Sequence, residues 1–383
     1  MENTVALGTL ITPAKNVRCG DNKYPVLSMT MHNGLIFQDE KFKKVIASKD
    51  TSDYKVVYRN QLVISFPIDE GVLAAQRITD AGIVSPAYGI WDIDEAKVLP
   101  EFLEYALRCD RAIQYYKANL RGSTARRRSL PTPTLLLFTV PLPPLEEQEE
   151  ILDRIHKAGS IIEKREMQLR AFDELIKARF VELFGDPVYN DKSWETDTVE
   201  NLCKEIYGGG TPSKSHQEYY DNGDIPWVSS KDMKSDVISD SQIHITQLGV
   251  DNSTAKMVPI NSVIMVIRSG ILKHTLPVAI NTVPVTVNQD LKVFIPGERI
   301  LTRFLAVQFK MHEKDILSGV RAVTADNIEF NSLKRRHIIV PPIELQQRYV
   351  STLEQVDKSK VAVQKSLDET QVLFDSLMQE YFG

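Results

Sequence analysis

Two segments of this chain carry apolar residues at alternating steps of three and four positions, the spacing of helices that pack against each other. In residues 143–187, Pro143 and Pro144 suit the first turn of a helix, whereas Gly185 and Pro187 suit its end. The pattern predicts one long helix between them. Its apolar seam comprises Ile151, Ile155, Ala158, Ile162, Leu169, Phe172, Ile176 and Leu183, interrupted by Arg165 and Arg179.

Residues 341–383 repeat the first segment without a gap, so that residue n of the first corresponds to residue n + 198. The two prolines, Gln148 and Phe184 recur as Pro341-Pro342, Gln346 and Phe382. We therefore expect two long helices of one design that pack on each other. The second seam comprises Tyr349, Leu353, Val356, Val363, Leu367, Phe374, Leu377 and Tyr381, interrupted by Lys360 and Thr370.

The segments that precede the helices, residues 1–142 and 188–340, share an order of elements. In the first, strand-like runs at 24–31, 56–66 and 82–93 precede one helical pattern over 100–120, a basic loop and strand-like residues 135–140. In the second, runs at 224–233, 256–270 and 283–295 precede a helical pattern over 303–317 and another basic stretch. The order is repeated but the identity is weak. We therefore expect two domains of the same architecture, each of which recognises a different target.

Composition is that of ordinary globular protein, with 43% hydrophobic and 25% charged residues among 383. No apolar run reaches the roughly 20 residues of a membrane span, and the start lacks the pattern of a signal peptide. These features predict a cytoplasmic protein without a membrane partner. Cys19, Cys109 and Cys203 are odd in number and far apart, which indicates neither a disulfide framework nor a zinc site.

The net charge of −5 is unfavourable for binding DNA phosphates, but it averages over acidic helices and separate basic clusters. We interpret the lysine cluster as a solvated face, whereas the arginine run is a candidate for contact with nucleic acid. The clusters are Lys41, Lys43, Lys44 and Lys49, then Arg121, Arg126, Arg127 and Arg128, and finally Lys334, Arg335, Arg336 and His337.

The run from Pro143 to Gln148, the helix that ends at Phe184-Gly185-Asp186-Pro187, and residues 206–233 resemble the DNA specificity subunit of prokaryotic type I restriction-modification systems (HsdS). The resemblance extends over essentially the whole chain. It implies an α+β fold with two target-recognition domains of mixed α/β structure, two long antiparallel coiled-coil helices and an internal pseudo-twofold repeat. The expected boundaries are 1–142 and 188–340 for the domains, and 143–187 and 341–383 for the helices.

The resemblance also implies a non-catalytic subunit that reads double-stranded DNA. Each domain would read one half of a bipartite, asymmetric target, and the helices would set the spacer. Modification subunits would carry S-adenosylmethionine, and restriction subunits would carry ATP and Mg²⁺, so this chain itself would bind no cofactor. The expected docking surface for these subunits is the outer face of the helix pair, including Glu147, Glu150, Arg154, Arg165 and Arg179. Arg165 and Arg179 could instead set helix register.

Side chains that donate or accept hydrogen bonds read base edges, while basic side chains and backbone amides hold phosphates. The candidates in the second domain are Gly209, Thr211, Ser213, Lys214, Ser229, Lys231, Arg268 and Lys273. Those in the first are Ser28, Thr30, His32, Asn33, Arg77, Ser123, Thr124, Arg126, Arg127 and Arg128. Each could instead lie in an ordinary surface turn, and the run Gly208-Gly209-Gly210 could be a flexible turn that contacts nothing.

The sequence contains no methyltransferase tetrad, no phosphate loop, no His-Glu-x-x-His and no Gly-x-Ser-x-Gly. A self-contained nuclease or methyltransferase would need such a constellation, so the pattern favours a non-enzymatic binding subunit. The alternative is a duplicated coiled-coil scaffold that binds only protein, which the acidic net charge favours.

Overall fold

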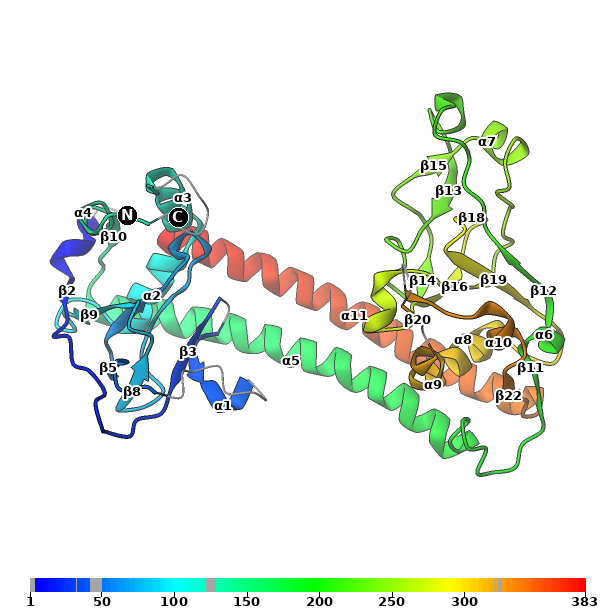
Figure 1. Ribbon diagram of the computed structural model, residues 1–383, viewed down its shortest axis with the longest axis horizontal. Helices are drawn as coiled ribbons and strands as arrows, with labels where there is room; N and C mark the ends of the chain where they lie inside the picture. The colour runs from blue at the N-terminus through cyan, green and yellow to red at the C-terminus, as the bar shows by residue number, and fades with distance from the viewer. Residues whose placement is uncertain (1–3, 32, 42–49, 122–128, 320, 323–325) are drawn as a thin grey trace. The chain divides into compact units, whose positions relative to one another are not determined.

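The computed structural model describes residues 4–31, 33–41, 50–121, 129–319, 321–322 and 326–383. The chain folds into two compact units. Unit 1 comprises Met1–Met167 and Gln364–Gly383, and unit 2 comprises Gln168–Val363. Each unit thus combines one segment that the sequence predicts as a recognition domain with half of each long helix (Figure 1). The predicted α+β fold with two domains and a helix pair is confirmed.

Unit 1 is built on a four-stranded antiparallel sheet in the order β2 (Ile11–Pro13), β9 (Gly89–Ile93), β6 (Leu62–Ile64) and β7 (Leu73–Ala75). Separate antiparallel pairs are β3 (Leu27–Thr30) with β4 (Gly34–Phe37), and β5 (Lys55–Tyr58) with β8 (Ala81–Val84). The short helices are α1 (Gln38–Lys41), α2 (Pro100–Arg108), α3 (Asp110–Asn119), α4 (Thr132–Leu136) and the 3-10 turns η1 (Leu7–Thr9) and η2 (Ile68–Glu70). Its main core joins the sheet to α2 and α3 through Leu62, Leu73, Phe102, Leu103 and Tyr116.

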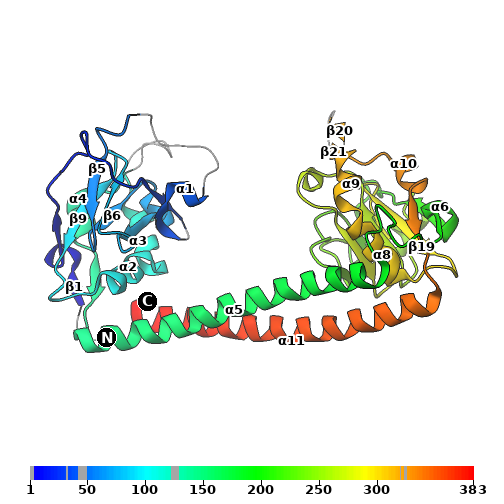
Figure 2. The same ribbon diagram turned by 90° about the horizontal axis from the view of Figure 1, so that it is seen from below.

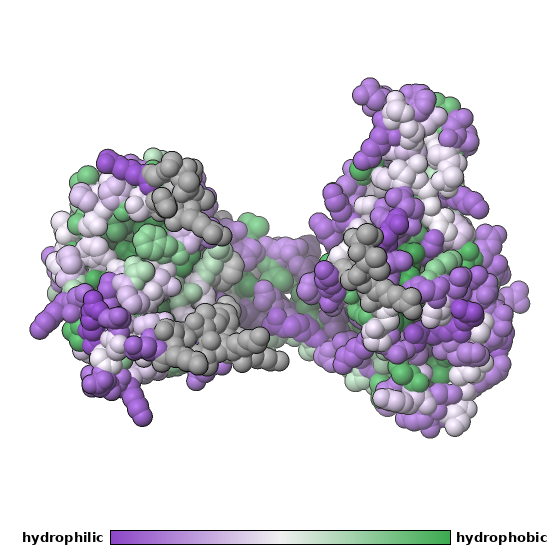
Figure 3. Space-filling view, in the orientation of Figure 1, coloured by the Kyte–Doolittle hydropathy of each residue, from purple (hydrophilic) through white to green (hydrophobic). Residues whose placement is uncertain are grey.

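Unit 2 contains a five-stranded sheet in the order β12 (Cys203–Gly208), β19 (Leu291–Pro296), β16 (Val263–Val266), β17 (Val278–Asn281) and β14 (Val237–Ile238). A second sheet has the order β15 (His244–Ile245), β13 (Ile225–Val228) and β18 (Thr286–Val287). The short helices are α6 (Val199–Leu202), α7 (Gln247–Asp251), α8 (Thr302–Met311), α9 (Glu313–Ser318), α10 (Phe330–Lys334), η4 (Gln217–Tyr219) and η5 (Gly270–Lys273), and β20 (Arg321–Ala322) pairs with β21 (Asp326–Asn327). Apolar residues are mostly inside, and the visible face is largely hydrophilic (Figure 3).

The internal repeat is visible in the sheets as well as in the helices. The order β2, β9, β6 and β7 in unit 1 has its counterpart in β12, β19, β16 and β17 of unit 2, and all neighbours are antiparallel in both. Each unit also pairs its first strand with the strand before its long helix. These pairs are β1 (Thr4–Ala6) with β10 (Thr139–Pro141), and β11 (Thr196–Thr198) with β22 (His337–Ile339).

The two predicted long helices are α5 (Leu145–Phe184) and α11 (Ile343–Phe382). Both prolines precede each helix, so α5 begins after Pro144 rather than at Pro143. In unit 1 the start of α5 lies beside the end of α11, since Arg154 donates a hydrogen bond to the Tyr381 hydroxyl at 2.8 Å. In unit 2 the end of α5 lies beside the start of α11, since the Tyr349 hydroxyl donates to the Ile176 carbonyl at 3.1 Å. Within each unit the helices are therefore antiparallel. All predicted seam positions are buried or half-buried.

Two corresponding glutamines hold the long helices to the two units. Gln148 is fully buried in unit 1, where its carbonyl accepts from the Leu99 amide at 2.9 Å and its amide donates to Lys97 and Pro143 carbonyls at 3.0 and 2.8 Å. Gln346 is fully buried in unit 2 and makes the equivalent bonds to Leu301, Arg299 and Pro341 at 3.0, 3.0 and 2.8 Å. Leu99 and Leu301 are the residues just before α2 and α8. Each glutamine therefore joins the start of a long helix to the start of a domain helix.

The other ends of the helices are held by aromatic packing. In unit 1, Phe382 at the end of α11 lies 5.0 Å from Phe102 of α2, measured between ring centroids. In unit 2, Phe184 at the end of α5 lies 5.0 Å from Phe304 of α8, again between ring centroids. The end of α5 and the helix α8 are seen in Figure 2. Both terminal phenylalanines are fully buried. Each unit therefore packs against the beginning of one long helix and the end of the other.

Every predicted strand run contains at least one strand, but two expectations about helices and one about a strand are wrong. The pattern after Pro100 forms two helices, because Cys109 has an extended backbone with ψ of 161° between α2 and α3. The pattern over 303–317 is likewise divided at His312 into α8 and α9. Residues 135–140 are not one strand, since α4 covers Leu135 and Leu136 before β10 begins. In the first case the apolar spacing continues because both helices bury residues in one core.

Within the described ranges, no helix combines the length and apolar character needed to cross a membrane. The same residues contain no group of three or more histidine, cysteine, aspartate or glutamate side chains that could hold a metal ion.

Candidate nucleic-acid interface

In unit 2 the loops that follow four strands meet at one place. The Gly210 amide, after β12, donates to the Val287 carbonyl at 3.0 Å. The Asn288 amide, after β18, donates to Val228 at the end of β13 at 2.9 Å. The Ile267 amide, after β16, donates to the Asp290 carbonyl at 2.9 Å. We call this place the strand-end surface, defined by Thr211, Ser229, Arg268, Gln289, Asp290 and Lys292.

The glycine run borders this surface and is packed against backbone. A Cβ atom on Gly209 would lie 1.8 Å from the Val287 carbonyl oxygen, and one on Gly210 would lie 2.3 Å from the backbone of Thr254. The Gly210 carbonyl also accepts a hydrogen bond from the Trp227 ring at 2.9 Å. The interpretation of a flexible turn that contacts nothing is therefore wrong. Close backbone approach requires these glycines.

The polar side chains of the strand-end surface are partly engaged with one another. The Thr211 hydroxyl donates to Gln289, and the Ser229 hydroxyl donates to Asp232 at 2.7 Å. Arg268 forms an ion pair with Asp290 at 2.6 Å. These bonds fix the positions of the loops. The donor and acceptor atoms of these side chains that are not used in the bonds are therefore held in a defined geometry. Ser213 is held by Ser215 at 2.7 Å, and the predicted Lys214, Lys231 and Lys273 are exposed.

Lys292 adds a second positive charge beside Arg268. Burial, and next the charge of Arg268, lower the pKa of its ammonium group. Its nitrogen lies 4.7 Å from the centre of the Phe330 ring, a cation–π distance. Two cations held close together by the fold, of which Arg268 is already paired with Asp290, suit an incoming phosphate.

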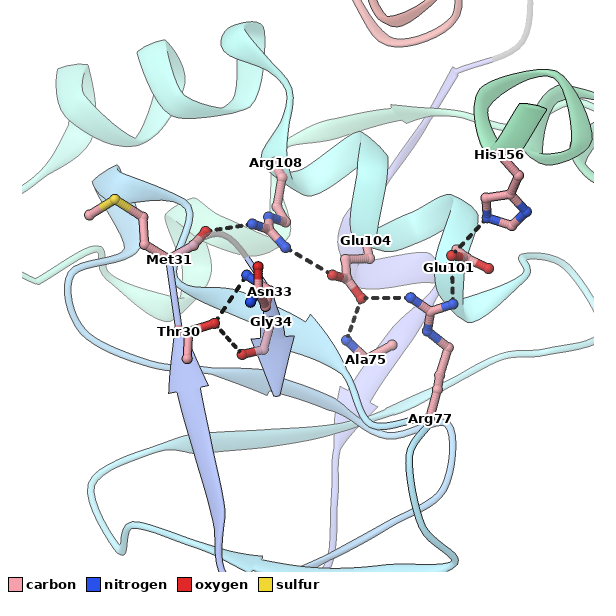
Figure 4. A network of polar contacts seen from close by, with 10 residues as sticks. All are labelled: Thr30, Met31, Asn33, Gly34, Ala75, Arg77, Glu101, Glu104, Arg108 and His156. Carbon is pink, nitrogen blue, oxygen red and sulfur yellow. Dashed lines mark hydrogen bonds and ion pairs between the residues drawn. The ribbon is translucent and has the colours of Figure 1, made fainter. Parts of the chain in front are cut away.

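In unit 1 the corresponding candidates lie on the hairpin of β3 and β4. The Thr30 hydroxyl donates to the Gly34 carbonyl at 3.0 Å and accepts from the Asn33 amide at 3.0 Å, which closes the turn (Figure 4). Asn33 is exposed, whereas Ser28 and Thr30 are half-buried. The predicted His32, Ser123, Thr124, Arg126, Arg127 and Arg128 lie outside the described residues.

A chain of charged groups connects this hairpin to α5 (Figure 4). Arg108 donates to the Met31 carbonyl at 2.6 Å and to Glu104 at 3.0 Å. Glu104 in turn accepts from the Ala75 amide at 3.0 Å and lies 3.7 Å from Arg77. Burial raises the pKa of Glu104, although the Ala75 amide and the two arginines oppose that shift.

The same chain of groups continues to the long helix. Arg77 forms an ion pair with Glu101 at 2.6 Å, and His156 of α5 lies 3.0 Å from the same Glu101 oxygen. Burial acts to raise the pKa of Glu101, but hydrogen bonds and charge from Arg77 and His156 outweigh it and lower the pKa. Arg77, predicted to contact DNA, is thus engaged by two glutamates. Its side chain is 41% exposed.

The candidates predicted from the sequence do not include Glu101, Glu104 or Arg108 of this network, nor Gln289, Asp290 and Lys292 in unit 2. A signal was present for the first set, because Glu104 and Arg108 are four positions apart on one helix face. Nothing local indicates the second set, since its neighbours come from other strands.

The predicted docking residues divide into two groups. Glu147, Glu150 and Arg154 line one cavity of about 410 Å³ in unit 1, together with Pro144, Glu146, Ile151 and Tyr381. Arg165 and Arg179 lie elsewhere, half-buried on the seam, and Arg179 forms an ion pair with Glu182 at 2.6 Å. The first group forms a predominantly acidic recess. The second group occupies seam positions.

Comparison with known proteins places this geometry in context. The protein-family model described as type I restriction modification DNA specificity domain matches the sequence twice, over residues 8–170 and 191–370. The EcoR124I/EcoR124II specificity subunit of Escherichia coli is 40% identical over 153 residues, which cover 39% of this chain and 38% of that protein. The MjaIX specificity subunit of Methanocaldococcus jannaschii is 23% identical over 299 residues, which cover 73% of this chain and 68% of that protein.

Two solved structures share the fold over nearly the whole chain. The S subunit of a type I restriction-modification system from M. genitalium has a TM-score of 0.59 at 13% identity and covers 100% of this chain and 96% of its own. A chain from a structure concerned with complex assembly and conformational transition of the type I R-M system has a TM-score of 0.58 at 17% identity, covering 99% and 97%.

Proposed function

This chain belongs to the type I restriction modification DNA specificity family, and from that premise we propose that it is the non-catalytic subunit that selects the DNA sequence for such a complex. Unit 1 and unit 2 would each read one half of a bipartite, asymmetric target. The observation that carries the proposal is the contrast within the repeat. The helix anchors Gln148 and Gln346 make matching bonds, whereas the candidate DNA contacts of the two units lie on different elements, the hairpin of β3 and β4 in unit 1 and the strand-end surface in unit 2.

The long helices would set the distance between the half-sites. A helix of 40 residues is about 60 Å long at 1.5 Å per residue. A turn of B-DNA is roughly 34 Å, so two reading surfaces at such a separation would leave unread base pairs between them. Since each unit holds the beginning of one helix and the end of the other, both helices would contribute to this spacing.

The partners would be double-stranded DNA, modification subunits and restriction subunits, in the cytoplasm of a prokaryotic cell. S-adenosylmethionine, ATP and Mg²⁺ would be bound by those subunits, which supply the chemistry. The recess of Glu147, Glu150 and Arg154 supports a docking site for a partner with basic side chains, because three glutamates outnumber its one arginine.

The decisive experiment is to map adenine methylation across the genome of cells that express the cognate modification subunit, with and without this chain. A bipartite motif that appears only with the chain is the expected result, and it would give the target bases and spacer together. If active modification subunits produce no chain-dependent motif, the proposal fails and a scaffold that binds only protein becomes the better interpretation of the repeat.

A further inference from the structure

Unit 2 contains a second basic region, separate from the strand-end surface. A cavity of about 350 Å³ opens where α9, α10 and β22 meet the segment that follows α5. Its polar lining is His312, Asp315, Ser332, Arg335, Arg336 and His337. The last three belong to the basic cluster at 334–337, for which the proposed reading of DNA gives no role.

Two buried groups in this cavity have unused hydrogen-bonding atoms. His312 is 3% exposed, and neither of its ring nitrogens has a partner among the described residues. The Nε atom of Arg336 is also buried without a partner among them. Buried polar atoms of folded proteins nearly always pair with protein, ordered water or a ligand, so an unpaired set that lines a cavity marks a place where water or a ligand can bind.

The charged groups that line the cavity determine whether it suits an anion or a cation. Arg336 forms an ion pair with Asp315 through Nη1, which leaves its Nε free to donate to something else. Arg335 contributes a second guanidinium, and Asp315 is the only carboxylate among the described residues that line the cavity, while the Asp186 carboxylate outside the lining also acts on His312. Burial, and next the charge of Arg336, lower the pKa of His312 to about 4, so its ring is neutral at pH 7 and one nitrogen carries a hydrogen. The cavity therefore offers more donors and positive charge than acceptors.

We propose that this cavity binds a phosphate group, which accepts hydrogen bonds from Arg336 Nε and from a ring N–H of His312. A phosphate has several oxygens around one centre, so it can accept from both donors and approach Arg335 at the same time. Ser332 adds a hydroxyl at the same wall. The group could belong to a small free phosphate compound or to the backbone of DNA.

The position of the cavity is compatible with the second source. A smaller cavity shares Asp315, Ser332 and Arg336 with it and extends to Ile328. The Ile328 amide donates to the Ile267 carbonyl at 2.8 Å, one residue from Arg268 of the strand-end surface. A nucleic-acid backbone that reached the strand-end surface could therefore place a further phosphate here.

The test uses the full chain labelled with ¹⁵N only in histidine, to which inorganic phosphate is added. The His312 signal, assigned by its loss in His312→Gln, should shift with saturation, and Arg336→Lys should weaken phosphate binding by about tenfold because lysine lacks the guanidinium fork. Arg299→Lys, at an exposed arginine paired with Glu195 and Asp197, should leave binding unchanged. Absence of a saturable shift would overturn the proposal, as would equal binding of acetate, which would assign the cavity to carboxylates.

A second arm distinguishes the sources of phosphate and does not depend on the proposed target specificity. Binding of the same variants to a short duplex of arbitrary sequence is measured over a range of salt concentrations. If Arg336→Lys weakens this binding and reduces its salt dependence relative to Arg299→Lys, the phosphate belongs to DNA. If it weakens only the binding of inorganic phosphate, the cavity serves a free phosphate compound. The phosphate-binding and duplex-binding results would keep their meaning even if the methylation experiment gave no chain-dependent motif.

Discussion

Gln148 and Gln346 make the same three kinds of hydrogen bond in two different units, at distances that agree within 0.1 Å. In each case one amide side chain satisfies a backbone N–H at the start of a domain helix and two carbonyls nearby. The Leu99 and Leu301 amides are in positions where a helix start leaves donors without internal partners. The repeated glutamine therefore fixes the angle at which a long helix leaves its domain.

Replacing Gln346 by alanine should lower the free energy of unfolding of unit 2 by about 2–4 kcal/mol, because a buried amide N–H and two carbonyls lose their partner. The measurement is chemical denaturation of the full chain, followed by the exchange of the Leu301 amide hydrogen. Gln355→Ala on the same helix is the matched control, since Gln355 is exposed. Equal stability of the two variants would contradict a structural role for Gln346.

Gly209 gives a sharper test of packing at the strand-end surface. Gly209→Ala would place a methyl group 1.8 Å from the Val287 carbonyl oxygen, so the backbone must shift. We expect destabilisation of about 1–3 kcal/mol or more, measured by thermal unfolding. Gly159→Ala is the control, because no described atom outside the neighbouring backbone of α5 lies within 4 Å of its added Cβ, and alanine favours helix by up to about 1 kcal/mol. A neutral Gly209→Ala would return the glycine run to the status of an unconstrained turn.

The sequence was sufficient to predict what depends on local periodicity. The long helices, their ends and their repeat follow from a spacing that each segment carries within itself. Phe180 shows the limit. It is fully buried but lies one position from the seam residue Arg179, because its ring packs on Phe304 and Tyr349 where the end of α5 meets unit 2. The apolar seam is predicted only for contact with the other long helix. It therefore cannot include a residue that packs against a domain as well.

The candidate site was predictable only in part, for a related reason. Thr211, Ser229 and Arg268 are candidates that the sequence predicts, but their grouping depends on hydrogen bonds between loops that are far apart along the chain. The strands β12 and β17 also escaped prediction. The partner of β12 is β19, which is distant in sequence, so no nearby turn signals that pair. β16 and β17 follow each other in the chain, but residues 267–277, which include η5, join them in place of a tight turn.

Arg108 should control the position of the hairpin of β3 and β4. Arg108→Ala removes its hydrogen bonds to the Met31 carbonyl and to buried Glu104, so we expect a loss of about 1–3 kcal/mol in stability. We also expect faster hydrogen exchange at the Asn33 amide. Arg18→Ala, which removes only an exposed ion pair with Asp53, should cost less than about 1 kcal/mol. Unchanged exchange at Asn33 would show that the network does not hold the turn.

His312 should make unit 2 less stable in acid. Its pKa is about 4 in the folded chain and 6.5 in the unfolded chain, so the unfolded state binds more protons between these values. The free energy of unfolding should therefore fall as pH decreases from about 6.5 to 4, by up to about 3 kcal/mol. Arg336 favours the neutral ring, whereas Asp315 and Asp186 oppose it without reversing the shift. Urea unfolding across this range should show a weaker pH dependence in His312→Gln. His216→Gln, at an exposed histidine, should retain the full dependence.

The helix lengths should determine the spacer of the proposed target. Inserting seven residues after Met167 in α5 and after Val363 in α11 places both insertions where the two compact units divide, and leaves every anchor residue in its own unit. Seven residues preserve the seam and lengthen each helix by about 10 Å, which corresponds to about three base pairs. We expect methylation maps to show both half-sites unchanged and the spacer longer. Insertion into one helix alone should abolish the motif, because the seam residues of the pair no longer align. A double insertion that keeps the original spacer would refute the role of the helices in setting it.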